Sequence, residues 1–353
     1  YGTLDKKRVT SSITSIKGSE LVNGLGGSTI ATALQGKVSG LTISGSSSPN
    51  SSNGYQLRGV ASVNAGKGPL VVIDGVPGGD LRMINQEDVQ SIDVLKDASA
   101  GAIYGTRAAA GVILVTTKQA KEGKVRATWT TELSTETVRK SLDILSSKDY
   151  MAYGIGQDYG YDTDWYRQLV DDRQLSQRHV LSLSGGSKNL QVYSSLMYSD
   201  QKGIVIGDGR TDYSGRMNAK YKMMDGKVEL MFKAQYRQAD RDRRNGTSTF
   251  EQVISLNPTI PVMDPTNSKN YNTTVGIGGT THNPVADIEL EDYKGTDKWL
   301  QADATLKVNI WDGFAVQGTM GIDHRDYQLT QYYHQNHQSM VESNKRGQGT
   351  HTF

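Results

Sequence analysis

Two sets of side chains in this sequence have the chemistry that coordinates metal ions. Imidazole nitrogens bind transition metals, and three histidines lie near the end of the chain: His334, His337 and His351. Carboxylates bind calcium, and three aspartates lie close together earlier: Asp158, Asp162 and Asp164. The histidines lack a carboxylate partner or a fixed helical spacing, and the aspartates lack the glycine and terminal glutamate of a dedicated calcium loop. Both sets are interpreted as polar surface loops, and no metal site is predicted.

Motifs for nucleophilic catalysis and phosphate binding are missing as well. The sequence has no G-x-S-x-G element. The glycine-rich segments 24–27 and 276–279 have no third glycine at the required offset after a strand, and no GK[ST] follows them. Cysteine is absent, which excludes a disulfide framework and a cysteine metal site. The protein is therefore not expected to be an enzyme, and no cofactor is predicted.

One aromatic cluster has the composition of a sugar-contacting surface. Its rings lie among acidic residues in a long connection: Tyr159, Tyr161, Trp165 and Tyr166. Aromatic faces stack on sugar rings while carboxylates accept hydroxyl protons, so these residues are candidate substrate contacts. The alternative is a loop that packs on its own side chains, as compact surface loops often do.

The segment from Pro69 to Thr117 is the most informative part of the chain. It reads as strand 69–73, a turn at Asp74-Gly75, a short helix, strand 91–95, a second short helix and strand 111–117. Asn85 is expected to cap the first helix in a capping box with Asp88. The second helical turn, 98–104, is expected to end at Gly105 in the left-handed conformation.

Residues before this segment extend the same small α/β module. Residues 9–16 and 39–44 are expected to be strands, and Ser28 is expected to cap a helix over 29–34. The Ser/Asn/Gly-rich stretch 44–54 is interpreted as a loop. Arg58, Asp74 and Tyr104 are expected to pair with one another or their neighbours and hold the module together, with direct substrate contact as the alternative.

Three short motifs in this module resemble those of one transporter family. They are ALQG at 33–36, LRG at 57–59 and the run LKDASA…IYG.RAA.GVI.VTTK that ends at Lys118. The segment 1–122 resembles the plug domain of the SusC/RagA family of TonB-dependent outer-membrane transporters. In the pattern of that family the plug signature includes Arg58, Gly59, Asp74, Gly75, Tyr104 and Gly105. The resemblance also implies two protein partners: TonB, through a segment upstream of Tyr1, and a SusD-like surface lipoprotein.

Composition is compatible with this resemblance. No stretch approaches the roughly 20 apolar residues that a membrane-spanning helix needs. The mean hydropathy of −0.52 does not exclude a transmembrane barrel, because half of each strand faces a polar lumen. Lys+Arg 39 against Asp+Glu 37 gives a nearly balanced chain, so no nucleic-acid partner is indicated.

Beyond residue 122 the hydrophobic period changes to two, which is typical of half-buried strands. Apolar and polar residues alternate in seven expected strands, less cleanly in the second and the seventh: 124–138, 176–186, 189–200, 211–223, 227–239, 298–310 and 314–327. The domain prediction is a plug over 1–122 and the N-terminal portion of a transmembrane β-barrel over 123–353. The polar tail 331–353 is interpreted as a loop.

The connections between these strands sort by length. Tight ones at 185–189, 224–226 and 311–313 alternate with longer ones at 139–175, 201–210 and 241–297. Outer-membrane barrels have this asymmetry, whereas the turns of a β-sandwich need not sort by side. Seven strands cannot close around a plug without unpaired edges in lipid. The expected fold class is thus a small α/β plug followed by antiparallel strands of a plugged barrel of about 22 strands.

The alternation also predicts which face of each strand meets lipid. Leu230, Phe232, Leu306 and Val308 are expected to face the bilayer, because a slip of one residue would put every charge there. Glu229, Lys233, Asp303 and Lys307 are then expected to face the lumen. Several wall residues are expected to hold the plug through ion pairs and hydrogen bonds: Arg126, Glu132, Arg216, Lys220, Glu229, Lys233 and Arg237.

The function that the resemblance implies is TonB-energised import of a large nutrient, an oligosaccharide first, across the Gram-negative outer membrane. An oligopeptide importer of the same family is the first alternative, because no lumen-facing signature separates the two. A siderophore receptor fits the LKDASA form of the signature less well. A surface adhesion or interaction protein with a β-sandwich fold is the alternative of another class, and it predicts unsorted loop lengths and a polar outer face.

Overall fold

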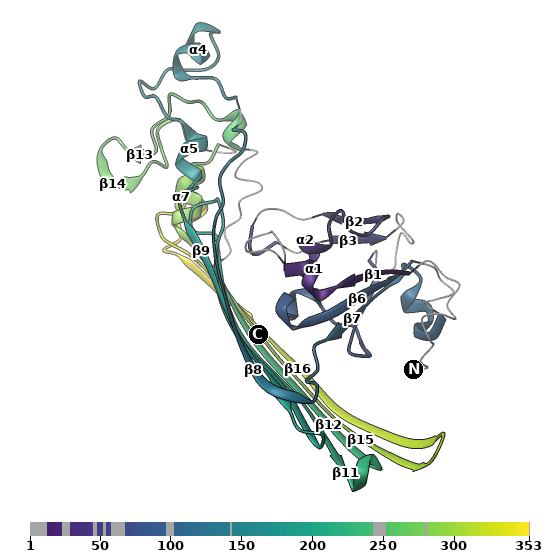
Figure 1. Cartoon of the computed structure of the whole chain (residues 1–353). Coiled ribbons are helices and arrows are strands. Elements are labelled where there is room, and N and C mark those ends of the chain that lie inside the picture. The colour runs from purple at the N-terminus through teal and green to yellow at the C-terminus, as the bar shows by residue number, and fades with distance from the viewer. Residues whose placement is uncertain are drawn as a thin grey trace.

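Two sheets organise the chain, a small one near its beginning and a long one formed by the rest (Figure 1). The computed structural model describes residues 13–22, 29–44, 48–51, 54–57, 68–96, 102–141, 143–242, 252–278 and 281–352. The small sheet and its short helices lie against one face of the long, curved sheet (Figure 1). We call the described residues up to Lys118 the N-terminal module and the long sheet the wall.

The N-terminal module is built on a five-stranded sheet with the order β1-β6-β7-β4-β5. Its strands are β1 (Ile13–Lys17), β4 (Leu70–Ile73), β5 (Val76–Pro77), β6 (Val89–Leu95) and β7 (Val112–Thr117). Strands β4 and β7 run parallel, and the other neighbours are antiparallel. A second hairpin and short helices complete the module: α1 (Gly18–Val22), α2 (Ile30–Leu34), β2 (Leu41–Ser44), β3 (Gly54–Leu57), η2 (Leu81–Met83), η3 (Gln86–Asp88) and η4 (Ala102–Ala108).

An apolar core holds these elements together. Ile16, Leu34, Ile92 and Ile113 are among its fully buried members. Burial of such side chains contributes about 1.5–3 kcal/mol each. The module therefore has a core of its own. Each strand that the sequence predicts is present where the structure describes it, and β3 and β5 are strands that the sequence did not predict. Of the expected strand 9–16, residues 9–12 lie outside the described residues.

The turns and caps of the module agree only partly with expectation. Asp74 and Gly75 form the expected turn with φ of 49° and 89°. Thr29, rather than Ser28, caps α2, and its Oγ1 accepts from the Thr32 amide at 3.4 Å. Asn85 caps η3 as expected, but Asp88 does not close a capping box, because its carboxylate accepts from Tyr193 in the wall. Gly105 has a positive φ of 69° and a non-helical backbone, so the first helical turn ends there as expected, and a second short turn continues to Ala108.

The wall is an eight-stranded antiparallel sheet in which sequence neighbours pair, with the order β17-β16-β15-β12-β11-β10-β9-β8. Its strands are β8 (Gly123–Thr135), β9 (Leu175–Gly186), β10 (Leu190–Lys202), β11 (Gly209–Met223), β12 (Val228–Asp242), β15 (Glu291–Trp311), β16 (Phe314–Tyr333) and β17 (Gln348–Thr352). All seven expected strands are confirmed, and β15 begins earlier than predicted. The expectation of a loop over 331–353 was wrong for β17, whose backbone pairs with β16 although its side chains do not alternate.

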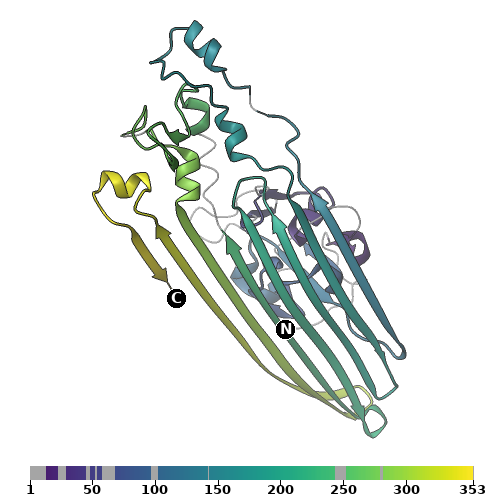
Figure 2. The ribbon, with the colours of Figure 1, turned by 90° about the vertical axis from the view of Figure 1, so that its left-hand side faces the viewer.

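Tight and long connections lie at opposite ends of the strands, and we call these two ends the edges of the wall (Figure 2). The tight ones join β9 to β10, β11 to β12 through η5 (Met224–Gly226), and β15 to β16. Asp225 and Gly313 have positive φ in these turns. β8 starts at the same edge, because Gly123 pairs with Gly186. The prediction that tight and long connections sort to opposite sides is confirmed. Tyr1 is outside the described residues, so its position is not part of this result.

The two faces of the wall carry the residues expected of them. Leu230, Phe232 and Leu306 are exposed on the face away from the module. Lys233 and Asp303 lie on the other face, where they line a gap against Asp74 of the module. Glu229 and Lys307 are cross-strand partners on that same face. The predicted register is confirmed.

The long connections pack into a cluster of their own beyond the wall. They contain α4 (Ser147–Ala152), α5 (Trp165–Leu169), β13 (Met263–Asp264), β14 (Asn267–Tyr271), α7 (Pro284–Glu289) and α8 (Gln338–Glu342). Leu169, Val253, Ile260 and Val285 form a buried core between them, which we call the loop core. Among the residues that the structure describes, no helix has the length and apolar character needed to cross a membrane.

Candidate functional site: the contact between module and wall

The aromatic cluster expected to contact substrate belongs largely to the loop core. Trp165 is 3% exposed and Tyr166 9%. The Trp165 indole donates to the Asn257 carbonyl at 3.2 Å, and Tyr159 packs against the same core. Tyr161 is 43% exposed. The structure thus presents the ring of Tyr161 to solvent and uses Trp165 and Tyr166 for packing, as the self-packed alternative states.

The candidate metal ligands do not converge. Asp158 and Asp162 accept local bonds from the Gly160 amide and the Ser147 hydroxyl, respectively. Asp164 caps α5. In the described part of the chain, no three His, Asp or Glu side chains are placed to hold a metal ion.

The three histidines of the tail have separate partners. His334 Nε2 lies 3.4 Å from Asp292, and His351 lies against Thr330 and Gln328. His337 Nδ1 accepts from the Ser339 amide and caps α8, while Nε2 faces Asp287 at 3.4 Å. Burial lowers the pKa of His337 and raises that of Asp287. Each of these histidines therefore makes its own local contacts, and the three do not form a common site.

Of the plug-signature residues, Asp74 makes the contacts with the wall. Arg58 and Gly59 lie outside the described residues, so their pairing stays a prediction. Tyr104 packs against Val72 and Val112 within the module. Asp74 pairs inside the module as expected, because it accepts hydrogen bonds from Thr117. It also binds Arg216 of the wall, which was not expected of it.

Asp74, Thr117 and Arg216 form a closed set of hydrogen bonds. The Thr117 amide and hydroxyl donate to the Asp74 carboxylate at 2.9 and 2.6 Å. Arg216 Nη2 lies 2.6 Å from both Asp74 Oδ2 and Thr117 Oγ1, and its Nη1 donates to Gln235 at 2.6 Å. The Arg216 and Asp74 side chains are 5% and 8% exposed. Breaking a buried pair of this kind by removing one partner is strongly destabilising.

A second arginine, Arg178 in β9, binds the short helix η3. It donates to the Glu87 carboxylate and to Asn85 Oδ1, and it lies 3.4 Å from Glu132 in β8. Burial raises the pKa of Glu87, and the charge of Arg178 opposes that rise. Next to this set, the Tyr193 hydroxyl donates to Asp88 at 2.8 Å.

A third arginine, Arg237 in β12, reaches the module through a backbone carbonyl. It donates to the Arg82 carbonyl and is paired with Asp212 at 3.0 Å, which also binds Arg210. The Arg82 side chain turns the other way and pairs with Asp80 at 2.7 Å. Burial would raise the pKa of Asp80, but the hydrogen bonds and charge of Arg82 hold it below its usual value.

Charge complementarity is the common feature of these contacts. Arg178, Arg216 and Arg237 of the wall meet Asp74, Glu87 and backbone carbonyls of the module. Amide groups of the wall add to them, since Asn218 donates to the Lys118 carbonyl at 2.8 Å and Gln235 to the Met83 carbonyl. Such groups exchange protein partners for water with a small net change in free energy.

One contact is apolar. Trp299 of β15 is 2% exposed and belongs to the hydrophobic core of the module together with Ile73 and Leu81. Its indole donates to Asp323 at 3.1 Å, and the Arg325 guanidinium lies 5.6 Å from the ring. Arg325 also donates to the Gly78 carbonyl. The β15–β16 side of the wall is therefore joined to the module by an indole as well as by polar groups.

Sequence reasoning found some of these residues and missed others. Arg216 and Arg237 were expected at the contact and bind the module. Glu132 was expected there too, but its partner is Arg178 of the wall, at 3.4 Å. Lys220 and Glu229 pair with each other at 2.8 Å instead of binding the module, and Arg126 is exposed. The prediction left out Arg178, Tyr193, Asn218, Gln235 and Trp299, although their strand parity places all five on the lumen-facing side.

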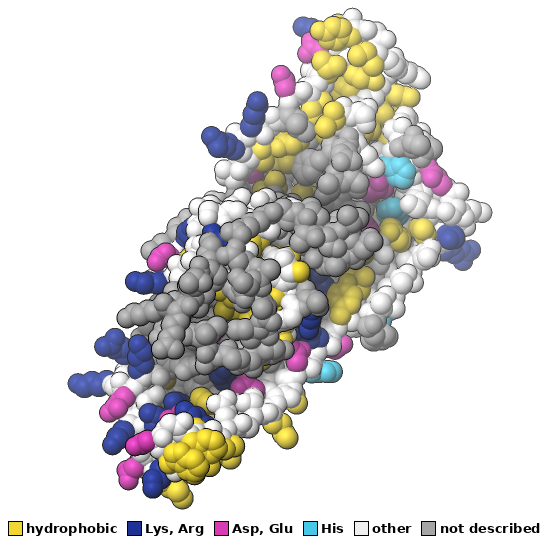
Figure 3. Space-filling model, turned by 90° about the vertical axis from the view of Figure 1, so that its right-hand side faces the viewer, with side chains coloured by type: hydrophobic (Ala, Val, Ile, Leu, Met, Phe, Trp, Pro, Cys, Tyr) yellow, Lys and Arg dark blue, Asp and Glu magenta, His cyan; other side chains and the backbone are white. Residues whose placement is uncertain are grey.

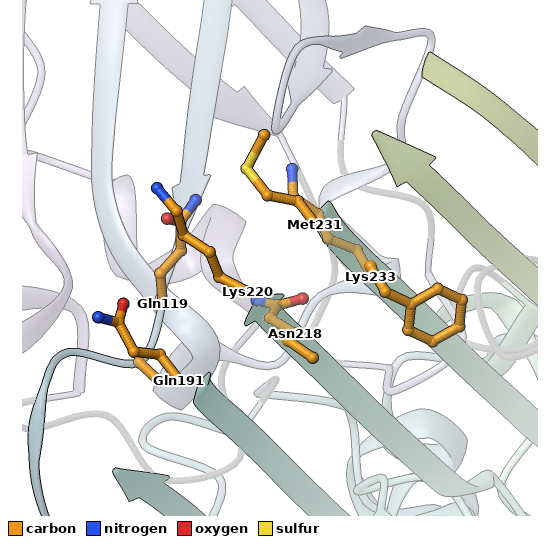
Figure 4. A pocket seen from close by; sticks show the side chains of 9 residues that line it. Gln119, Gln191, Asn218, Lys220, Met231 and Lys233 are labelled. Atoms are coloured by element: carbon orange, nitrogen blue, oxygen red, sulfur yellow. The ribbon is translucent and has the colours of Figure 1, made fainter. Parts of the chain in front are cut away.

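Among the described residues, two small gaps lie along the contact. One lies beneath the segment that joins β7 to β8 and is lined by Gln119, Gln191, Asn218, Lys220, Met231 and Lys233 (Figure 4). The other is lined by Asp74, Arg216, Lys233, Gln235 and Asp303. Viewed from the module side, charged side chains of both signs gather at the end of the molecule below the module (Figure 3).

Comparison with known proteins identifies both parts of this arrangement. The TonB-dependent Receptor Plug Domain family matches residues 5–112. The TonB-dependent receptor SusC of Bacteroides thetaiotaomicron is 30% identical over 83% of the chain, and the TonB-dependent receptor P26 of Formosa agariphila is 31% identical over 85%. The chain belongs to the SusC/RagA family of TonB-dependent outer-membrane receptors. It spans about a third (33%) of the length of these two relatives.

Solved structures show the same fold. The RagAB peptide transporter matches 92% of the chain with a TM-score of 0.76 and 21% identity, and the match covers 42% of that protein. The ferripyoverdine receptor of Pseudomonas aeruginosa matches 94% of the chain with a TM-score of 0.55 and 15% identity, over 36% of its length. The fold class predicted from the sequence, a plug followed by strands of a plugged barrel, is confirmed. The protein is an outer-membrane protein, and its N-terminal module is a plug.

Proposed function

We propose that the protein takes part in TonB-energised import of a large nutrient through a barrel that the plug closes. The observation that carries this proposal is the charge-complementary contact between plug and wall. Its ion pairs and hydrogen bonds hold the plug in place, and each can be replaced by water when the plug is displaced. An apolar interface of the same size would resist such displacement, because it would expose hydrocarbon to water.

The proposed division of labour follows the two sheets. Residues 1–122 form the plug and residues 123–353 the N-terminal portion of the barrel. The edge with the tight turns faces the periplasm, and the long connections project outward. TonB would pull on the plug from the periplasmic side, and a SusD-like surface lipoprotein would cover the outer opening.

An oligosaccharide is the proposed substrate, with Tyr161 as an exposed aromatic contact and Tyr159, Trp165 and Tyr166 as the packed residues that position its loop. The 30% identity with the receptor SusC supports membership of the same family, and it does not identify the substrate of this chain. The alternative of an oligopeptide is favoured by the fold of the RagAB peptide transporter, at 21% identity. No catalytic step is proposed.

Uptake and binding, measured side by side, test this function. We expect cells with the full-length transporter to bind and import a labelled oligosaccharide, and cells that also lack TonB to bind it without importing it. A matched oligopeptide panel separates the two substrate classes. Equal import with and without TonB would contradict the proposal and leave a passive pore.

A further inference from the structure

The two gaps between plug and wall form one line along strands β11 and β12. Lys233 lines both of them. The first gap begins at the tight-turn edge, beneath Gln119 and Ala120, where the chain passes from the plug to β8 (Figure 4). The second lies farther from that edge and ends at Asp74 and Arg216. We call this line, from Gln119 past Lys233 to Asp74, the seam.

Each gap contains a buried polar atom without a protein partner among the described residues. Asn218 Oδ1 lies at the first gap and Arg216 Nε at the second. Asn218 is 5% exposed and Arg216 7%. Buried polar atoms in native proteins are almost always hydrogen-bonded, to water where no protein group is available. Both halves of the seam therefore have the polarity of a hydrated crevice.

The inner end of the seam is closed by the turn between β4 and β5. Asp74 and Gly75 both have positive φ, at 49° and 89°, as Asp-Gly pairs do in two-residue hairpin turns. The Asp74 carboxylate is bound by Thr117 and Arg216. These contacts hold the turn against the wall. Releasing Arg216 from Asp74 would remove one of those contacts and open the seam at this point.

We propose that the seam is the first aqueous path to open when the plug shifts, and that the Asp74–Thr117–Arg216 contact is its closure. This deepens the proposed function, on which it rests, by naming where plug and wall separate. The path would admit small hydrophilic solutes and prefer anions. Its ionisable lining is cationic in excess, with Lys220, Lys233 and Arg216 against Asp74 and Asp303.

Conductance of the purified full-length transporter in planar bilayers tests the proposal. We expect Asp74→Asn, whose side chain tolerates the same backbone, to show a steady conductance above that of the native protein and an anion-selective reversal potential. Adding Lys233→Glu should shift the selectivity toward cations. Asp312→Asn, which makes the same change of charge at an exposed position in the tight turn between β15 and β16, is the matched control and should stay at the native baseline.

Two further measurements keep the test decisive if Asp74→Asn folds poorly. Thr117→Val removes a hydroxyl from the same closure without changing any charge, and it should also raise the conductance. Lys233→Cys in either background should be modified by a charged thiol reagent added from the periplasmic side, with a fall in current. Equal conductance of Asp74→Asn and Asp312→Asn, or an ion selectivity that Lys233→Glu leaves unchanged, would overturn the proposal. These currents need neither TonB nor nutrient, so their failure is distinct from failure of the uptake test.

Discussion

The loop core and the plug–wall contact are both buried, but they are built from opposite chemistry. The loop core joins three long connections through apolar side chains such as Trp165, Leu169 and Ile260. The plug–wall contact joins two sheets mainly through arginines and carboxylates, including Arg178, Arg216 and Glu87. The difference indicates that the outer loops are fixed to one another, whereas the plug is held by groups that water can replace.

Trp299 is the exception that refines this comparison. Its indole is part of the plug's own core although it comes from the wall. The plug is therefore attached by polar contacts along β9 to β12 and partly by an apolar contact at β15. Displacement that begins on the polar side would need the least exposure of hydrocarbon, which agrees with the location of the seam.

The largest expected effect is in the loop core. Trp165→Ala should destabilise the outer loops by about 3–5 kcal/mol, because it leaves a cavity among buried residues. Limited proteolysis of the full-length protein should then cut within 139–290 much faster than in the native protein. Tyr153→Ala, at a 72% exposed position in the same connection, is the control and should leave the cleavage rate unchanged. Equal cleavage of both variants would contradict an apolar loop core.

Removing one partner from the plug–wall contact comes next. Arg216→Met should weaken the attachment of the plug by about 3 kcal/mol or more, because Asp74 remains as a buried, unpaired charge. Hydrogen exchange of the β4 and β7 amides should report the change. The double variant Arg216→Met with Asp74→Asn removes both charges and should recover most of the protection. If the double variant is as unprotected as the single one, the charge argument is wrong.

The outer face of the wall offers a test of the register. Phe232→Arg should cost about 2–4 kcal/mol if the residue lies near the middle of the bilayer. Denaturant titration of the full-length protein in lipid vesicles measures this change. Lys233→Arg, one residue along and on the lumen-facing side, keeps the charge and should have little effect. A large effect at Lys233 and none at Phe232 would reverse the assignment of faces.

Alkaline pH probes the interior of the plug. Burial, with the charge of Asp80, raises the pKa of Tyr55 from 10.0 to about 12. The folded plug therefore keeps this proton where the unfolded chain loses it, so stability should fall as the pH rises from about 10 to about 12, by at most a few kcal/mol. Tyr55→Phe should remove this dependence and cost little at neutral pH, because the hydroxyl has no hydrogen-bond partner among the described residues. Thermal unfolding at several pH values measures both effects.

The sequence predicted the strands and their faces because period-two alternation is a local property. It placed Leu230 and Lys233 on opposite faces without any knowledge of their neighbours. The same parity would have put Arg178 and Tyr193 on the lumen-facing side, but parity alone does not say which lumen-facing residues meet the plug. That depends on the plug's position, which brings Glu87 to Arg178 across 91 residues of sequence.

The burial of Trp165 and the formation of strand β17 could not be predicted from the local sequence, because both depend on contacts with distant parts of the chain. Trp165 belongs to one buried cluster with Leu256 and Ile277, about 100 residues later in the chain. The composition of the loop around Trp165 therefore suited either a sugar contact or a packed loop. β17 forms through backbone pairing with β16, and its side chains carry no alternation. The cap of α2 is one residue later than the sequence predicted, because Thr29 has the extended backbone of an N-cap and its side chain accepts from the Thr32 amide.

The smallest expected effect concerns the aromatic ring that remains exposed at the loops. Tyr161→Ala should lower the affinity of the full-length transporter for its oligosaccharide several-fold, because a ring contact contributes about 0.5–1.5 kcal/mol. Tyr161→Phe keeps the ring face and should bind nearly as well as the native protein. Isothermal titration with the two variants separates this local loss from the collapse expected for Trp165→Ala, since Tyr161→Ala should leave the proteolysis pattern of the loops unchanged. Native affinity of Tyr161→Ala, together with intact loops, would remove Tyr161 from the substrate surface and confine the aromatic cluster to packing.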